Sequence, residues 1–348
     1  MNKTSLLSFV DQMYPSSSQK KYWTFRDESD LEKSRYEANR RFVLKHGANM
    51  SEEQQERFFL TPNEESLLRR QYEIQLREFC RKFQPPMPKS VAGTSFHYFK
   101  RFYLHNSVME YHPKEILVTC VYLACKVEEF NVSISQFVGN IRGDREKASD
   151  IILNNELLLM QQLNYHLTVH NPFRPVEGFL IDIKTRCPNL KDPERLRPGM
   201  EEFLDRCLWT DACLVYSPSQ LALAALLHST SKVQENLDSY VTDTLFGGEK
   251  GADKLPGLVE AVRRIRSMAK AVEPPPRDRI RPLEKKLERC RNTIKEQEAK
   301  KNKGHRDFVD EEDELEMRAM EERNDRSARS SRQGTEECYP LQNSPGSQ

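Results

Sequence analysis

The chain has 348 residues, with 54 Lys and Arg against 53 Asp and Glu, and its formal net charge at pH 7 is +1. A chain this close to neutrality has no global field to hold a polyanion, so no direct nucleic-acid partner is expected. No apolar run approaches the ~18 residues that a membrane-spanning helix needs, so no membrane partner is expected either.

Residues 1–60 are predicted to be an N-terminal segment with one strongly charged helix, from residue 27 to about residue 45. Leu31, Ala38 and Phe42 lie at offsets 0, 7 and 11 of this helix and form one narrow apolar stripe. The first 13 residues show no secretory signal, because Asp11 follows the short apolar stretch at once. We therefore expect a reducing compartment, in which disulfides do not form.

Residues 61–168 are the first part of a longer region, which extends to about residue 270. The apolar pattern of this region is helical almost throughout, and the alternation typical of strands is missing. The pattern predicts an all-α fold. Its clearest helices are predicted over residues 64–82, 89–106, 114–128 and 155–164. The third of them is apolar nearly all round, so other helices must surround it, with Val121 and Leu123 almost inaccessible.

The order of helices recurs once, in residues 169–272. Each proline that opens a helical segment in residues 61–168 has a counterpart 105 to 110 residues later. The pairs are Pro62 and Pro172, Pro88 and Pro198, and Pro113 and Pro218. A second nearly all-apolar helix begins at Leu221. Such a period indicates a duplicated domain, and the alternative is a chance recurrence of prolines, which begin many helices.

Residues 273–303 are predicted to form a C-terminal helix, which follows the stiff spacer Pro274-Pro275-Pro276. Its single apolar stripe consists of Leu283, Leu287, Cys290 and Ile294. A stripe of this kind more often packs on its own domain than on a partner. Residues 304–348 are predicted to be a disordered charged tail, because residues 307–322 carry nine acidic side chains and one Arg.

The chain carries no recognisable catalytic, metal or cofactor motif. It has no Gly-rich nucleotide loop and no G-x-S-x-G, and its cysteines include no C-x-x-C pair. His166 and His170 have i, i+4 spacing, but they run into Asn-Pro, which is typical of a helix exit. We predict that the chain is not an enzyme and holds no metal and no cofactor. The cysteines are predicted to be buried thiols: Cys80, Cys120, Cys125, Cys187, Cys207, Cys213, Cys290 and Cys338.

One basic stretch with interleaved aromatic residues needs a separate interpretation. Lys100 and Arg101 lie among Phe and Tyr residues, a composition seen in single-strand binders. However, Phe99, Phe102 and Tyr103 stand at i, i+3 and i+4, which is the spacing of a buried helix face. The stretch is therefore predicted to be core.

Several segments, in order and spacing, resemble the cyclin box. They are residues 87–96 (MPKSVAGTSF), 100–104 (KRFYL), 123–129 (LACKVEE), 156–159 (ELLL) and 163–167 (LNYHL). Further segments are similar to the cyclins of the CDK-activating kinase: residues 21–25 (KYWTF), 106–113 (NSVMEYHP), 130–133 (FNVS), 136–140 (QFVGN) and 170–175 (HNPFRP). The similarity runs from about residue 16 to residue 291. It implies two five-helix cyclin-fold repeats, which agrees with the repeat of prolines.

The resemblance also implies which residues bind a kinase. Lys126 and Glu156 match the Lys/Glu pair with which cyclins grip kinase main chain, and Glu129 and Tyr165 belong to the same segments. The alternatives are a helix-end lysine that complements the helix dipole, a Glu156 that only pairs with Lys126, and solvated surface positions for Glu129 and Tyr165. Residues 67–76 lack the Met-Arg-x-Ile-Leu patch with which cell-cycle cyclins capture substrates, so such docking is not expected.

The function that the resemblance implies is regulatory. The chain would bind and activate a cyclin-dependent kinase catalytic subunit, together with a RING-finger assembly factor and the TFIIH core, in the nucleus. The kinase would act on kinase activation loops and on the RNA polymerase II C-terminal domain. The resemblance further implies terminal helices beside the first repeat, with Trp23 and Phe25 as anchors of the N-terminal one. Two rivals stay open: a cyclin-fold transcription factor that binds promoter DNA, and an inert helical scaffold.

Overall fold

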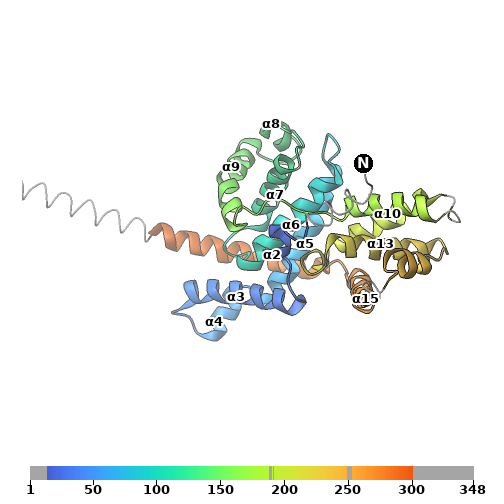
Figure 1. Cartoon of the computed structure of the whole chain (residues 1–348). Helices are drawn as coiled ribbons and strands as arrows, with labels where there is room; N and C mark the ends of the chain where they lie inside the picture. Colours follow the sequence, from blue (N-terminus) through green and yellow to red (C-terminus); the bar gives the residue numbers. More distant parts are fainter. Residues whose placement is uncertain (1–13, 188–189, 191, 249–252, 301–348) are drawn as a thin grey trace, which may run out of the picture. The chain divides into compact units, whose positions relative to one another are not determined.

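The computed structural model describes residues 14–187, 190, 192–248 and 253–300, and within these ranges every regular element is a helix (Figure 1). The predicted all-α class is therefore confirmed. Nowhere in the described ranges is a helix long and apolar enough to cross a membrane. The predicted disordered tail, residues 304–348, and residues 1–13 lie outside the described residues. Contacts divide the chain into residues 1–290 and residues 291–348.

The N-terminal segment contains α2 (Ser18–Tyr22), α3 (Glu28–Gly47) and α4 (Glu52–Phe58). α3 begins where the sequence predicts, because the Asp27 carboxylate caps it by accepting from the backbone N–H groups of Ser29 and Asp30. The predicted apolar stripe of α3 is buried against α5 and α6. α4, which has no buried residue, was not predicted.

The first repeat consists of α5 (Pro62–Lys82), α6 (Lys89–His105), α7 (Pro113–Val127), α8 (Ile134–Val138) and α9 (Arg145–Gln162). α5 begins at a capping box in which Thr61 and Glu64 satisfy each other's backbone N–H groups. α7 is in contact with α5, α6 and α9, and Val121 and Leu123 are buried in it as predicted. The four predicted helices of this region are confirmed, and α9 begins ten residues earlier than its predicted segment.

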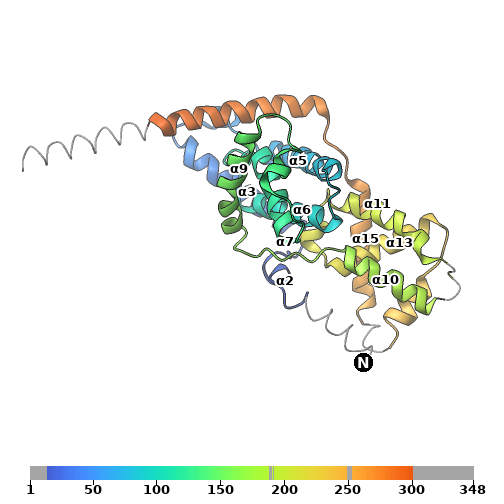
Figure 2. The same ribbon diagram turned by 90° about the horizontal axis from the view of Figure 1, so that it is seen from above.

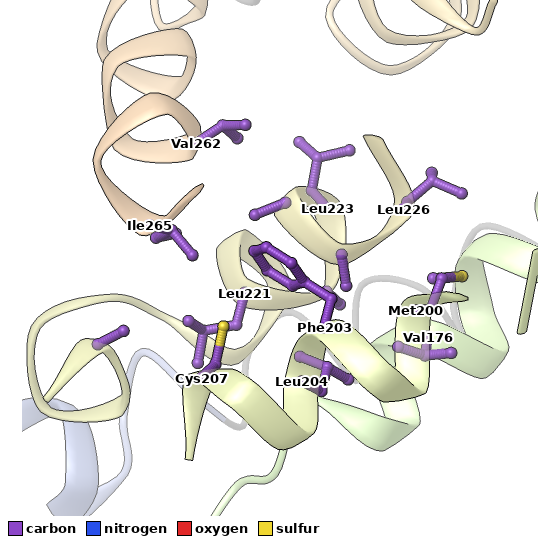
Figure 3. Packing of buried hydrophobic residues seen from close by; sticks show 14 of the residues in the cluster. Val176, Met200, Phe203, Leu204, Cys207, Leu221, Leu223, Leu226, Val262 and Ile265 are labelled. Carbon is purple, nitrogen blue, oxygen red and sulfur yellow. The ribbon is translucent and has the colours of Figure 1, made fainter. Parts of the chain in front are cut away.

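The second repeat consists of α10 (Phe173–Arg186), η1 (Pro193–Leu196), α11 (Arg197–Cys207), α12 (Ala212–Val215), α13 (Pro218–Lys232), η2 (Tyr240–Leu245) and α15 (Leu255–Ala271). α13 contacts α10, α11 and α15, as α7 contacts its own neighbours. Figure 3 shows side chains from α10, α11 and α15 gathered around α13. The proline periodicity therefore reflects a real repetition of helices around an apolar centre.

The two groups of helices stand beside each other in both views (Figures 1 and 2). Their interiors are continuous with the N-terminal segment, because the second repeat's core also contains Trp23, Leu31 and Leu104. The repeats are therefore joined through a shared apolar interior in addition to the connecting chain.

Residues 277–300 are helical, in agreement with the predicted C-terminal helix. Leu283, Leu287 and Cys290 of the predicted stripe are buried. The Lys286 ammonium donates to the Glu64 carboxylate of α5 at 2.9 Å and to the Glu56 carbonyl of α4 at 2.8 Å. This part of the helix is therefore docked on the N-terminal segment and the first repeat.

Candidate functional site

Lys126 and Glu156, the two residues of the expected kinase grip, are brought together from different helices. Lys126 lies in the last turn of α7, Glu156 lies in the middle of α9, and the ammonium is 2.6 and 2.9 Å from the two carboxylate oxygens. The Lys126 side chain is 48% exposed and that of Glu156 is 16% exposed. The pair is thus formed inside the chain and remains open to solvent.

The position of Lys126 has local causes. A cation in the last turn complements the partial negative charge at the carboxyl end of α7, and its Nζ lies 4.7 Å from the centre of the Tyr122 ring. Glu128 caps the helix and accepts a 2.6 Å hydrogen bond from the Thr94 hydroxyl of α6. These contacts place the Lys126 ammonium at the surface, next to Glu156.

Glu129 is exposed and lies immediately beyond α7. Its φ of +57° is in the left-handed region, which turns the chain away from the helix axis. The turn brings the Phe130 N–H back to the Cys125 carbonyl at 2.9 Å. Glu129 thus belongs to the same end of α7 as Lys126, and its carboxylate faces solvent.

Tyr165 follows the end of α9 in a second left-handed turn. Asn164 and Tyr165 have φ values of +51° and +57°, and the Tyr165 N–H donates to the Met160 carbonyl at 2.9 Å. Tyr165 is 59% exposed. The expected site residues therefore come from the end of α7, the middle of α9 and the turn after α9, and all are accessible except the partly covered Glu156.

Two leucines of α9 join this surface, and the sequence analysis missed them. Leu153 is 49% exposed and Leu157 is 55% exposed, and they lie one turn apart on either side of Glu156 in the sequence. The buried stripe of α9 is instead formed by Ile152 and Leu159. The sequence signal for these exposed leucines is that Leu153 and Leu157 stand at i, i+4 and lie off the buried stripe. Exposed apolar side chains around a charged pair are typical of a protein-binding surface.

The two expected terminal-helix anchors lie inside the molecule. Trp23 is 2% exposed, and its indole N–H donates to Nδ1 of His166 at 3.1 Å. The Phe25 N–H donates to the Leu214 carbonyl at 2.8 Å, and its ring packs against the core of the second repeat. Trp23 therefore joins the N-terminal segment to the end of the first repeat, and its side chain is covered by this chain. A contribution of either residue to kinase binding remains a prediction.

The basic stretch of α6 is core, as the helical spacing predicts. Lys100 and Arg101 are both buried, and Lys100 donates to the Glu73 carboxylate at 2.7 Å. Their charges are therefore not on the surface, where they could bind nucleic acid.

Most of the predicted buried thiols are also found in the interior. Of the described cysteines, only Cys187 is partly exposed, and Cys338 lies outside the described residues. Burial raises the pKa of Cys80 to about 12, which keeps its thiol protonated.

Two family models match the chain in tandem. The cyclin N-terminal domain matches residues 43–168, and the cyclin C-terminal domain matches residues 171–270. The matched ranges contain the first repeat, with Lys126 and Glu156, and the second repeat.

Similar proteins and structures agree with these matches. The chain is 47% identical over 284 residues to Cyclin-H of Xenopus laevis, which covers 81% of this chain and 88% of that protein. It is 29% identical over 269 residues to Cyclin CCL1 of Saccharomyces cerevisiae, covering 71% of this chain and 65% of that protein. A structure of the CAK complex from Chaetomium thermophilum, bound to ATP-gamma-S, matches with a TM-score of 0.68 at 28% identity, covering 84% of this chain and 95% of that one. The chain therefore belongs to the cyclin family and, within it, to the cyclin H proteins.

Proposed function

We propose that this chain is the regulatory subunit of a CDK-activating kinase and that it binds its kinase through the surface around Lys126 and Glu156. The observation that carries the proposal is the exposed ion pair between α7 and α9, flanked by Leu153 and Leu157. A paired charge next to exposed apolar side chains offers both burial and directed hydrogen bonds to a partner.

The pair has unused hydrogen-bonding capacity. An ammonium has three N–H donors and a carboxylate has several acceptor positions, so contact within the pair leaves both able to bind further groups. Lys126 would donate to carbonyl groups of the kinase backbone, and Glu156 would accept from its amides. Such charge-assisted hydrogen bonds are stronger than neutral ones. They recognise the backbone of the kinase and so do not depend on the identity of its side chains.

The mechanism is a population shift of the kinase. A surface that binds the conformation with an inward αC helix stabilises the Lys–Glu pair that orders the ATP phosphates. The chain is a non-catalytic activator, so the chemistry of phosphoryl transfer belongs entirely to the kinase. Glu129, just beyond the end of α7, and Tyr165, just beyond the end of α9, would add contacts that depend more on the particular kinase.

The wider assembly is part of the proposal. A cryo-EM structure of yeast TFIIK, which contains Kin28, Ccl1 and Tfb3, matches this chain with a TM-score of 0.57 at 25% identity and covers 74% of this chain and all of that one. On this likeness we infer a cyclin-dependent kinase, a RING-finger assembly factor and the TFIIH core as partners, and the nucleus as the location. Kinase activation loops and the RNA polymerase II C-terminal domain would be the substrates.

The five-part organisation of the chain is also proposed here, with parts at residues 1–60, 61–168, 169–272, 273–303 and 304–348. The arrangement of α5 to α9 around α7 and of α10 to α15 around α13 supports the two middle parts. Each repeat is therefore organised around its own apolar helix.

The test replaces the two charges in turn. Lys126→Ala and Glu156→Ala are each expected to weaken kinase activation about tenfold or more, because each leaves an unpaired charge at a desolvated interface. Their melting temperatures should stay within a few degrees of the wild type, since an exposed ion pair contributes about 1 kcal/mol or less. Purified kinase complexes, assayed for activity and cyclin affinity, provide the measurement.

A matched control exists in the second repeat. Lys232 and Glu202 form an exposed ion pair at 2.8 Å between α13 and α11. Lys232→Ala should leave activation unchanged. The double variant Lys126→Glu with Glu156→Lys keeps an ion pair in which the two charges have changed places. This variant should still fail to activate the kinase. Normal activation by both alanine variants would contradict the proposed site, and co-purification with a kinase without any rise in its activity would favour the scaffold.

A further inference from the structure

The connector between the repeats, residues 163–171, begins in a left-handed turn that Asn adopts readily and Tyr does not. Asn164 and Tyr165 are consecutive residues with a side chain and a positive φ, in which the Cβ atom crowds the following carbonyl. Such conformations persist only where surrounding contacts hold them, and they gather at binding sites. The contacts that hold the residues after Tyr165 therefore restrict the backbone that carries its ring.

The N-terminal helix α2 supplies one set of these contacts. Trp23 donates to Nδ1 of His166, and the Tyr22 ring stacks on the His166 ring with the centroids 4.7 Å apart and the planes 7° from parallel. The buried amide of Gln19 accepts from the His170 N–H at 2.6 Å and donates to the His170 carbonyl at 3.4 Å. We call Gln19, Tyr22 and Trp23 the α2 clamp. The clamp contacts the connector at His166 and His170, which follow Tyr165 by one and five residues.

Helix α6 holds the connector from the other direction. Tyr98 donates its hydroxyl to the Leu167 carbonyl at 2.6 Å, and Arg101 donates from Nη1 to the His166 carbonyl at 3.2 Å. His166 is therefore held by its ring and by its carbonyl at once. The three connector residues after Asn164 cannot reorient without breaking at least one of these bonds.

Arg101 links the two sets of contacts. Its side chain is fully buried, and Nε and Nη2 have no hydrogen-bond partner in the part of the chain that the structure describes. Its guanidinium carbon lies 5.2 Å from the centre of the Trp23 ring. A buried charge with so few partners depends strongly on an aromatic face and on a carbonyl. Arg101 therefore contacts the Trp23 ring and the His166 carbonyl at once, and we expect the two contacts to be energetically coupled.

We propose that the α2 clamp is a positioning device for kinase binding: with Arg101 and Tyr98 it fixes the connector so that Tyr165 is presented at the end of α9, the helix that carries Glu156. This inference rests on the proposed function and extends it to the N-terminal segment. α2 has five residues, too few to persist without contacts, so clamp and connector order each other. The segment acts on the kinase through Tyr165, and Trp23 itself stays covered.

The first test is Trp23→Phe in the full chain. The phenyl ring keeps an aromatic face near Arg101 but lacks the N–H that Trp23 donates to His166. Amide hydrogen exchange over residues 163–171 should rise about fivefold, and affinity for the kinase should fall by a similar factor, as expected for the loss of one hydrogen bond. His166→Asn, which keeps an acceptor near the position of Nδ1, should retain more affinity than His166→Leu.

The decisive test is a double-mutant cycle with Tyr165→Ala. If the clamp acts through Tyr165, Trp23→Phe will weaken the binding of the wild type but will add little to a chain that already lacks the Tyr165 ring. Phe25→Leu is the matched control, because it loosens the packing of the same segment on the second repeat and removes no hydrogen bond to the connector. It should lower the melting temperature and leave exchange over residues 163–171 unchanged.

The outcomes separate the two proposals. The positioning role is overturned if the effects of Trp23→Phe and Tyr165→Ala on kinase affinity are additive. It is also overturned if Trp23→Phe leaves amide hydrogen exchange in the connector unchanged. In either case Lys126→Ala still tests the proposed function. If Lys126→Ala and Glu156→Ala activate normally, the proposed site itself fails. A normal affinity of Tyr165→Ala alone overturns only the positioning role.

Discussion

Individual charged residues at the junction of the repeats are buried or partly buried and form ion pairs with one another. Arg35 of α3 donates from both terminal nitrogens to the Asp211 carboxylate, at 2.6 and 2.8 Å. Lys100 of α6 donates to Glu73 of α5 and lies 3.6 Å from Asp211. Asp211 precedes α12. One carboxylate of the second repeat therefore lies close to a cation from the N-terminal segment and to a cation from the first repeat.

At this residue scale we predict that Asp211→Asn lowers the free energy of unfolding by about 3 kcal/mol at neutral pH, because it leaves Arg35 and Lys100 without their shared counter-charge. Chemical denaturation followed by circular dichroism measures the change. Asp205→Asn is the control: Asp205 also accepts from an arginine, Arg77, at 2.8 Å, but it is more exposed, so about 1 kcal/mol or less is expected. Equal effects of the two substitutions would contradict the interpretation.

The same carboxylate gives the prediction a pH dependence. Burial alone would raise the pKa of Asp211, but the charges of Arg35 and Lys100 hold it well below its ordinary value of 3.8. A carboxylate with a lowered pKa stabilises the folded state above that ordinary value, and the contribution is lost as the pH falls below it. The stability difference between the wild type and Asp211→Asn should therefore be largest near neutral pH and should narrow as the pH falls below about 4.

At the scale of single elements, the helix of residues 277–300 shows how a narrow stripe becomes stable. Leu287 is fully buried, and the neighbouring Lys286 adds hydrogen bonds to α4 and α5. A helix with so small an apolar face is marginal alone in water, so its order comes from docking. The stripe was visible in the sequence, whereas its docking surface was not.

We predict that Leu287→Ala destabilises the protein by about 2 to 4 kcal/mol, because it leaves a cavity under a docked helix. The exposed neighbour Glu288 provides the control, and Glu288→Ala should change stability by no more than about 0.5 kcal/mol. Thermal melting and limited proteolysis of the full chain measure both variants. An effect of Leu287→Ala as small as that of Glu288→Ala would show that the helix contributes little to the fold.

On the scale of the whole molecule, function is expected to reside in the two repeats and their docked terminal segments. We predict that truncation after Asn302 leaves kinase activation intact, since residues 307–322 are too acidic to offset their ordering entropy by burying apolar surface. Activation by the truncated chain in the reconstituted kinase complex is the measurement. A loss of activation with an unchanged melting temperature would instead identify the tail as a docking segment.

Much of the secondary structure was determined by the sequence itself. Helix periodicity, capping and the missing N–H of proline act within a few residues, so the helices at 64–82 and 89–106 could be read directly. The same holds for the burial of Val121, because a helix without a polar face must be enclosed. The candidate site was named only through resemblance, since no local spacing distinguishes Lys126 and Glu156 from ordinary surface charges.

Only the tertiary structure decided how these residues meet. Lys126 and Glu156 are 30 positions apart and form an ion pair because α7 and α9 pack together. Trp23 and His166 are 143 positions apart, and their contact places the expected N-terminal anchor in the interior. Which apolar side chains of α9 stay exposed likewise depends on what packs against the helix. Local sequence preferences specify each helix and its apolar face, but contacts between distant segments determine which faces are covered and which remain available to a partner.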